Sequence, residues 1–372
     1  MVSVPYNATI IAHEKMSAFA YISIADAVLK LLIVYLLVLI PYDKLIVYAI
    51  LFFCVQAFDR IVYGIYCSRH FKETRTRPKY DGKQFKEIFV FAGWTMNGNL
   101  AVIGYTQGLN ILLNIFFGPT VNAARGIAVQ VQSVCQQFCG NFQMALNPQL
   151  TKSYAQGNLE NMHRLLVRSS KFSFYILLLV VLPLMFEAEL VLKVWLGIVP
   201  EHTVNFLRLM LVVGLLYTLS NPINVSVHAT GQLKKFQTIE GTMLLLIVPI
   251  AYFLLKHFNV LPECVFVVHI IVELLTQYAR IRIVLPMIGM QLITYFKQVI
   301  IPVSMTAVLT PIIPFVVFTH MSICWYQFFV ICVVNVLCIS FVIYTLGCTT
   351  SERKFLAEKF ASSVRKITNT YK

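Results

Sequence analysis

Charged side chains are scarce in this sequence. They make up 12% of the 372 residues, whereas 58% are hydrophobic, and the mean hydropathy is +0.75. Because soluble domains carry about 25% charged residues, this composition excludes an ordinary soluble fold. The formal net charge of +14 would suit nucleic acid only on a soluble basic surface, and here the basic residues lie between apolar runs. The sequence therefore predicts a polytopic membrane protein with membrane lipids, and no nucleic acid, as partners.

Motifs for catalysis and metal binding are also missing. We find no HExxH, GxSxG or Walker sequence and no aspartate cluster. The 9 cysteines lack paired CxxC spacing and are typical of small buried apolar residues. Cys135 and Cys139 lie one helical turn apart but have no further ligands nearby. We expect no enzyme, no metal and no cofactor.

Apolar runs of about 20 residues, enough to cross a bilayer, divide most of the chain. They predict an all-α protein with about ten membrane spans. The spans lie near residues 18–40, 43–67, 88–117, 121–146, 170–190, 203–227, 236–255, 262–285, 296–318 and 323–347.

Lysine and arginine gather in alternate connections. One side holds roughly 23 of them, Lys171 and Arg280 included, and the other roughly 3. Under the positive-inside rule, both termini are predicted to be cytoplasmic.

The longest basic connection, residues 68–87, contains Pro78 and Gly82 and is typical of a linker. The predicted organisation has five parts. These are the remnant of an amino-terminal helical bundle (1–67), a basic cytoplasmic linker (68–87), a six-helix bundle (88–285), two extra spans (286–348) and a basic amphipathic tail (349–372).

A polar stripe runs along the predicted span 121–146. At about 100° per residue, Gln132, Gln136 and Gln143 lie within roughly 20° of Arg125. The preceding span adds Gln107, Asn110 and Asn114 on one face. Unpaired amides and guanidinium groups are costly in hydrocarbon, so these faces are predicted to line a substrate cavity. The alternative is interhelical hydrogen bonding, although such bonding needs fewer amides.

Ionisable residues inside predicted spans are further candidates for a charge or coupling role. They include Lys30, Arg60 and Glu273. Lys30 lies four residues after Asp26, so a structural ion pair competes with function there. Glu273 is the deepest carboxylate and is predicted to lack a local partner.

Several segments resemble one family. FAGW (91–94), GLNILLNIFFGPTVNAARGIAVQVQ (108–132) and NFQMALNPQLTKSYAQGN (141–158) resemble bacterial oligosaccharide-lipid flippases of the O-antigen type. These belong to the MATE-like superfamily of multidrug and lipid-linked saccharide exporters. The segments 4–24, 194–210 and 229–237 are similar to the same family.

The resemblance implies two helical bundles in the cytoplasmic (inner) membrane of a bacterium. They would work by alternating access in the synthesis of cell-surface polysaccharide such as lipopolysaccharide. The implied cargo is a polyprenyl-diphosphate-linked oligosaccharide, and other polysaccharide-assembly proteins are implied partners. The family usually has six spans in its first bundle, whereas two precede the linker here. The resemblance thus implies that roughly four helices are missing at the amino end, and we expect transport to be impaired.

Two rival functions fit part of the sequence. A cation-coupled multidrug antiporter of the same superfamily would need a cavity carboxylate, for which Glu273 is the candidate. A membrane enzyme of polysaccharide assembly would need a large polar outer loop. The only sizeable one is predicted near residues 191–202, with Lys193, Glu201 and His202.

Overall fold

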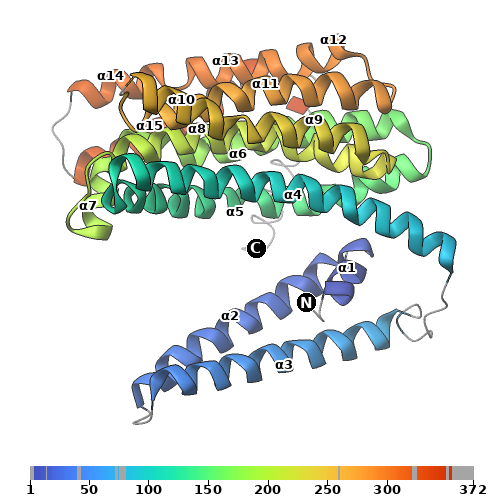
Figure 1. Ribbon diagram of the computed structural model, residues 1–372. Coiled ribbons are helices and arrows are strands. Elements are labelled where there is room, and N and C mark those ends of the chain that lie inside the picture. Colours follow the sequence, from blue (N-terminus) through green and yellow to red (C-terminus); the bar gives the residue numbers. More distant parts are fainter. Residues whose placement is uncertain are drawn as a thin grey trace, which may run out of the picture. The chain divides into compact units, whose positions relative to one another are not determined.

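A computed structural model describes residues 4–13, 15–39, 43–71, 74, 81–258, 260–320, 325–348 and 352–353. All regular structure in these residues is helical (Figure 1). Nine of the described helices are long and apolar enough to cross a membrane. The predicted all-α polytopic membrane fold is therefore confirmed.

The chain forms two compact units, Met1–Lys86 and Glu87–Lys372. In the first unit, α2 and α3 pack against each other and both contact α1. The carboxylate of Asp43 caps α3 by accepting a hydrogen bond from the backbone N–H of Leu45 at 2.9 Å. The bounds of these helices are α1 Val4–Ala12, α2 Met16–Leu39 and α3 Lys44–His70.

The second unit contains the long helices that build the candidate site. Its core lies mostly on α6 and α8, and α8 packs against α5, α6 and α11. The elements that begin within or just before this unit are α4 Gly82–Phe117, α5 Pro119–Ala155, α6 Leu159–Phe186, α7 Ala188–Leu196, α8 Thr203–Thr230, α9 Leu233–Leu245, α10 Ile247–Phe258, α11 Cys264–Met287, α12 Leu292–Tyr295, η2 Phe296–Ile300, α13 Ile301–Leu309, α14 Ile312–His320, α15 Trp325–Val342 and η3 Ile343–Gly347.

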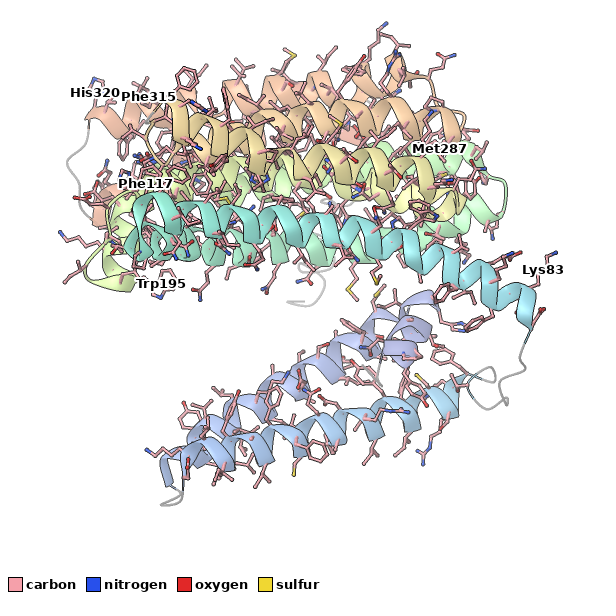
Figure 2. The ribbon with its side chains drawn as sticks, viewed as in Figure 1. Lys83, Phe117, Trp195, Met287, Phe315 and His320 are labelled. Carbon is pink, nitrogen blue, oxygen red and sulfur yellow. The ribbon has the colours of Figure 1, made fainter. Side chains whose placement is uncertain are left out.

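The long helices run alongside one another, so the bundle has two ends. Phe117, Trp195 and His320 lie at one end, and Met287 lies at the other (Figure 2). We call these the Phe117 end and the Met287 end. The turns at the Met287 end adjoin the predicted basic connections, so that end is predicted to face the cytoplasm.

Helix α5 differs from the other long helices in composition. It covers 37 residues but is not among the helices apolar enough to count as spans. Arg125 and the three glutamines of its polar stripe lower its hydropathy. The predicted span 121–146 is therefore present as a helix, and part of its polar face makes hydrogen bonds to neighbouring helices, as described below.

Prolines interrupt the predicted span 296–318. The described segment from Leu292 to His320 consists of α12, the π-helical η2, α13 and α14 in succession. Pro302 lies at the start of α13, and Pro311 lies in the turn before α14. Because proline has no backbone N–H, it removes a hydrogen bond of the helical ladder. The apolar composition predicted the position of this span. Its division into shorter helices depends on the prolines.

The prediction that Lys171 lies in a basic loop is wrong. Lys171 belongs to α6, is 1% exposed, and its Nζ lies 2.7 Å from a carboxylate oxygen of Glu352. It also donates to the backbone carbonyl of Gly347 at 3.2 Å. The ion pair with Glu352 makes the burial of the Lys171 charge tolerable. The hydrogen bond to Gly347 holds the end of η3 against α6. Apart from 352–353, the predicted amphipathic tail lies outside the described residues.

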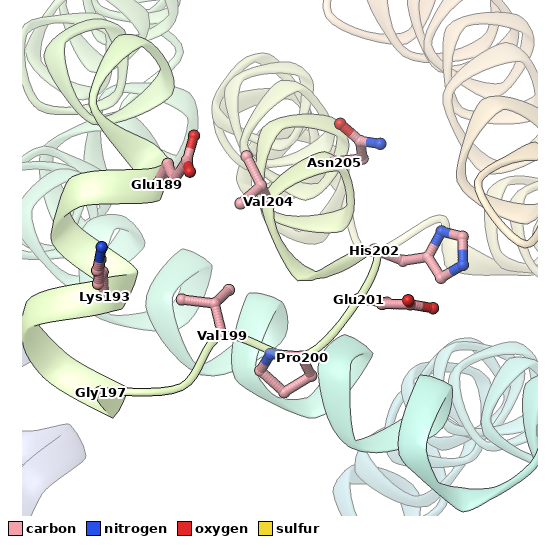
Figure 3. A pocket seen from close by; sticks show the side chains of 9 residues that line it. All are labelled: Glu189, Lys193, Gly197, Val199, Pro200, Glu201, His202, Val204 and Asn205. Carbon is pink, nitrogen blue, oxygen red and sulfur yellow. The ribbon is translucent and has the colours of Figure 1, made fainter. Parts of the chain in front are cut away.

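A short loop joins α7 to α8 and surrounds a hollow of about 420 Å³ (Figure 3). His202 has a backbone φ of 65°, and its ring Nδ1 lies 2.7 Å from Glu263 Oε1. Asn205 donates to the same oxygen at 3.2 Å. Partial burial acts to raise the pKa of Glu263, but the hydrogen bonds from His202 and Asn205 outweigh it and hold the pKa below its ordinary value.

This contact predicts a pH-dependent contribution to stability. A carboxyl whose pKa is lower in the folded state stabilises the fold above its unfolded pKa of about 4.3, and loses that effect as the pH falls through the folded pKa. Replacing Glu263 with glutamine is expected to lower the thermal midpoint at pH 7, and the gap from the wild type should close toward pH 3.5.

The measurement is thermal unfolding in detergent over that pH range. Glu201→Gln is the matched control, because Glu201 is an exposed carboxylate next to His202 in the loop between α7 and α8. A gap between wild type and Glu263→Gln that is the same at both pH values would contradict the assignment.

Candidate functional site

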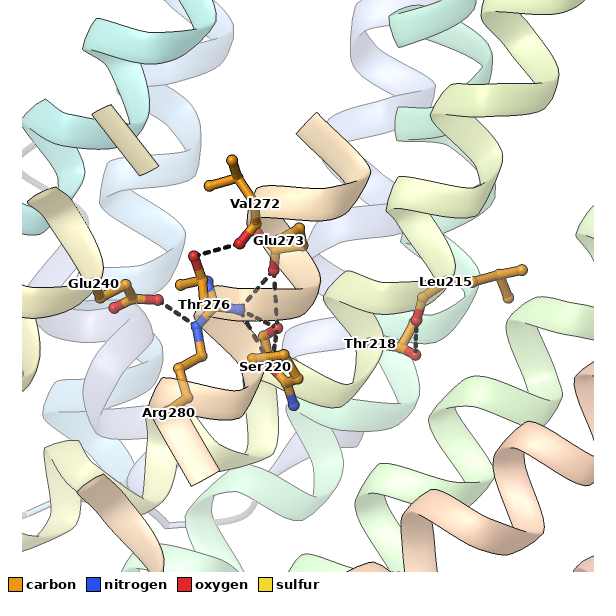
Figure 4. Close-up of polar contacts among 9 residues, drawn as sticks. Leu215, Thr218, Ser220, Glu240, Val272, Glu273, Thr276 and Arg280 are labelled. Carbon is orange, nitrogen blue, oxygen red and sulfur yellow. Dashed lines mark hydrogen bonds and ion pairs between the residues drawn. The ribbon is translucent and has the colours of Figure 1, made fainter. Parts of the chain in front are cut away.

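A buried arginine joins two carboxylates in the second unit. Arg280 on α11 is 3% exposed. Its Nε donates to Glu240 Oε1 on α9 at 2.7 Å, and one terminal nitrogen donates to Glu273 Oε1 at 2.5 Å (Figure 4). Burying these charges is tolerable because each one meets an opposite charge.

Neutral groups complete this cluster. The hydroxyl of Ser220 on α8 accepts a hydrogen bond from Arg280 at 2.7 Å and donates to Gln277 Oε1 at 2.8 Å. Arg280 also reaches Gln277 Oε1 at 3.2 Å. Residues 273, 277 and 280 lie at positions i, i+4 and i+7, so they share one face of α11. The cluster therefore ties α8, α9 and α11 together.

A cavity of about 570 Å³ adjoins the cluster. Its lining includes both cluster carboxylates and Arg280, and it is otherwise a mixture of amides, hydroxyls and apolar groups. The polar members of the lining are Thr95, Asn99, Tyr105, Thr151, Tyr217, Asn221, Asn224, His228, Gln237, Glu240, Glu273 and Arg280.

Two of the lining amides have unused hydrogen-bonding capacity. The buried Oδ1 atoms of Asn221 and Asn224 have no hydrogen-bond partner in the described part of the chain. An unpaired buried acceptor costs about 1–3 kcal/mol, so these atoms favour a donor from water or a bound molecule. The cavity is suited to a ligand with many hydroxyl groups.

The predicted residues Arg125 and Asn110 meet between α5 and α4. Arg125 is 5% exposed and donates hydrogen bonds to Asn110 Oδ1 and, at 3.4 Å, to the backbone carbonyl of Thr106. Asn110 in turn donates to Gln107 Oε1 at 3.0 Å. Among the described residues no carboxylate pairs with Arg125, and its Nε has no hydrogen-bond partner. Its positive charge is therefore not neutralised by a counter-ion within the described chain.

The arginine lies close to the cavity along α4. Tyr105 lines the cavity, and the next residue, Thr106, supplies the carbonyl that Arg125 contacts. Asn110 lies about one turn further toward the Phe117 end. Arg125 therefore lies about one helical turn from Tyr105, toward the Phe117 end of the bundle.

The glutamines of the predicted stripe lie against α8. Gln143 donates to the backbone carbonyl of Thr218 at 3.1 Å, and Gln132 is also buried. A Cβ on Gly214 would lie 3.3 Å from Gln132 and 3.6 Å from Gln136, so that glycine permits the close approach of the helices. These contacts are of the interhelical kind that we gave as the alternative. Gln107 and Asn114 are exposed on α4.

The charge candidates of the first unit have local partners. Lys30 Nζ lies 2.7 Å from Asp26 Oδ2, so the competing structural ion pair is present. A terminal nitrogen of Arg60 lies 3.2 Å from the hydroxyl of Tyr6, and its guanidinium carbon is 4.2 Å from the Tyr6 ring centroid. Both cations are thus held within this unit.

The prediction that Glu273 lacks a local partner is wrong, as is the placement of Arg280 in a basic loop. Arg280 is two turns along the same helix from Glu273, and its pairing accounts for the burial of both. The site residues that we did not predict are Ser220 and the cavity amides of α8, whereas Glu240 is one of the ionisable candidates inside a predicted span. The signal was present, because Asn221, Asn224 and His228 recur at i, i+3 and i+7 within an otherwise apolar run.

Comparisons with protein-family models, with curated proteins and with solved structures found no match to this chain.

The cluster predicts a strong effect of one substitution. Arg280→Gln should lower the free energy of unfolding by about 3–5 kcal/mol, because it leaves two buried carboxylates without a counter-charge. Replacing Glu240 and Glu273 with glutamine in the same chain should recover much of that loss. The measurement is the unfolding midpoint in detergent.

Arg282→Gln is the control, because Arg282 is an exposed arginine on the same helix. If the unfolding midpoint of Arg280→Gln equals that of the wild type, the cluster contributes nothing to stability.

Proposed function

We propose that this chain is a carrier-like membrane protein whose second unit binds the saccharide and diphosphate of a polyprenyl-diphosphate-linked oligosaccharide. The observation that carries this proposal is the polar cavity of about 570 Å³ inside an apolar helical bundle, next to a buried arginine without a carboxylate partner among the described residues. The family resemblance of residues 91–158 supports the same cargo.

The two arginines suit different parts of that cargo. Arg280 already faces two carboxylates, so its cluster offers little positive potential to an anion. Carboxylate and amide oxygens are good acceptors for sugar hydroxyls. Arg125 retains a full positive charge beside amides, and a planar guanidinium matches phosphate oxygens. We therefore assign the saccharide to the cavity and the diphosphate to Arg125.

Translocation across the cytoplasmic membrane by alternating access is the function that this binding would serve. Both carboxylates of the cluster lie on the helices that wall the cavity, so movement of α9 or α11 would change its shape. We place this step in the assembly of surface polysaccharide.

Binding measurements separate the two parts of the proposed site. The ligands are a polyprenyl diphosphate carrying a disaccharide and the same lipid without sugar. Asn221→Leu/Asn224→Leu should weaken binding of the first ligand about tenfold, since two hydrogen bonds are each worth about 0.5–1.5 kcal/mol, and leave the second unchanged. Arg125→Gln should weaken both, and Arg282→Gln should weaken neither.

Proteoliposomes test translocation itself. The sugar-bearing lipid, labelled with a fluorophore, should move to the opposite leaflet faster with the wild-type chain than without protein, and Arg125→Gln should slow it. Failure of the wild-type chain to bind either lipid would contradict the proposed cargo. Binding without movement would contradict the carrier function alone.

A cation-coupled multidrug antiporter is a second candidate, favoured by the two carboxylates, Glu240 and Glu273, that line one cavity. In that case Glu273→Gln should abolish cation-driven efflux in inverted vesicles. Unchanged efflux would rule out this version, whereas saccharide-lipid binding would be expected to survive the substitution.

A further inference from the structure

A second cavity in the same unit has the opposite chemistry. It has a volume of about 850 Å³ and lies among α6, α8, α13 and α14. Its walls are apolar side chains such as Phe174, Leu215 and Phe315. Among the described residues that line it, only Arg208 carries a charge. Its volume is within the range of small-molecule sites, about 300–1,000 Å³.

Arg208 has unused donors at the rim of this cavity. Its Nε donates to the backbone carbonyl of Met185 at 2.9 Å, which fixes the base of the guanidinium. Its two terminal nitrogens have no hydrogen bond or ion pair within the described chain. A guanidinium beside apolar walls is costly unless it meets water or an anion.

Arg208 lies near one end of a candidate membrane span, Thr203–Thr230. It lies five residues into α8, or about 7.5 Å from the helix start. Helix α8 begins shortly after α7, whose Trp195 lies at the Phe117 end (Figure 2). The apolar cavity extends from there along α6 and α8 toward the middle of the bundle. A molecule with a phosphate at one end and a long apolar chain would match both features.

This cavity is separate from the polar one. At about 100° per residue, Arg208, Val212 and Leu215 lie on one face of α8. Tyr217, Asn221 and Asn224 lie on roughly the opposite face. The two cavities share no lining residue. A lipid in the apolar cavity therefore lies behind α8 and is distinct from a cargo bound at Asn221.

We infer that the apolar cavity is a binding site for an anionic phospholipid. Its acyl chain fills the space between α6, α8, α13 and α14, and its phosphate accepts hydrogen bonds from the terminal nitrogens of Arg208. Charge complementarity favours this occupant, because a zwitterionic lipid carries an ammonium group beside its phosphate and so offers the guanidinium no net negative charge. The inference does not depend on the proposed cargo.

Native mass spectrometry of the full chain, delipidated in detergent, tests the site. Phosphatidylglycerol and phosphatidylcholine with the same acyl chains are added in turn. The wild type should bind phosphatidylglycerol more tightly. Arg208→Gln should weaken that binding about tenfold, the effect of losing one charge-assisted contact of about 1.4 kcal/mol, and should weaken phosphatidylcholine binding less. Lys193→Gln, an exposed cation at the same end, should change neither.

A second variant addresses the apolar part of the site. Ala307 lines the cavity on α13, and Ala307→Phe should fill part of it and weaken phosphatidylglycerol binding while Arg208 is retained. This variant keeps the test decisive if Arg208→Gln does not fold. Inorganic phosphate at millimolar concentration should not displace the lipid, because it has no acyl chain.

Three results would overturn the inference. Equal binding of the two lipids by the wild type would show ordinary contact with bulk lipid. Unchanged phosphatidylglycerol binding by Arg208→Gln or by Ala307→Phe would show that the lipid binds elsewhere. Displacement by inorganic phosphate would show an anion site without an acyl-chain pocket.

Discussion

Inside hydrocarbon, a polar group has no water to replace a missing partner, and this constraint determines how the second unit is built. Two deeply buried cations in its described part are explained by what they contact. Lys171 meets Glu352 and a backbone carbonyl, and Arg280 meets Glu240 and Glu273. These contacts join segments far apart in the sequence, so satisfying the charges also fixes which helices are neighbours.

The two buried arginines show two ways of meeting this constraint, with different consequences. Arg280 is neutralised by carboxylates, and the cost of removing it from water is offset by Coulomb attraction. Arg125 is held by an amide and a carbonyl, which satisfy hydrogen bonds but leave its charge in place. The first arrangement ties helices together, whereas the second keeps a positive potential beside the cavity. The number of arginines in the spans does not separate these two roles. What separates them is whether the arginine pairs with a carboxylate or with neutral hydrogen-bond acceptors.

Helix positions were largely predictable from the sequence, because a run of about 20 apolar residues has few alternatives in a chain of this composition. The polar faces of α4 and α5 were also visible as periodic amides. What those faces contact was not predictable, since Gln143 reaches Thr218 across 75 positions of sequence.

Arg280 was misplaced because a basic residue near the end of an apolar run has the same pattern whether it lies in a loop or pairs with a carboxylate two turns earlier. Glu240 joined the cluster through α9, and no local spacing indicates a contact between helices 40 residues apart.

Helix α8 forms a wall of both cavities, with an amide face toward one and an apolar face with Arg208 toward the other. A rotation of this single helix about its axis would therefore reshape the two spaces together. Any molecule that prefers one rotational state of α8 would alter the affinity of the opposite cavity by the same free energy, because such linkage is reciprocal. The lipid composition of the surrounding membrane would then change the affinity of the polar cavity for its ligand. The two sites would be coupled through α8, because this helix lines both cavities.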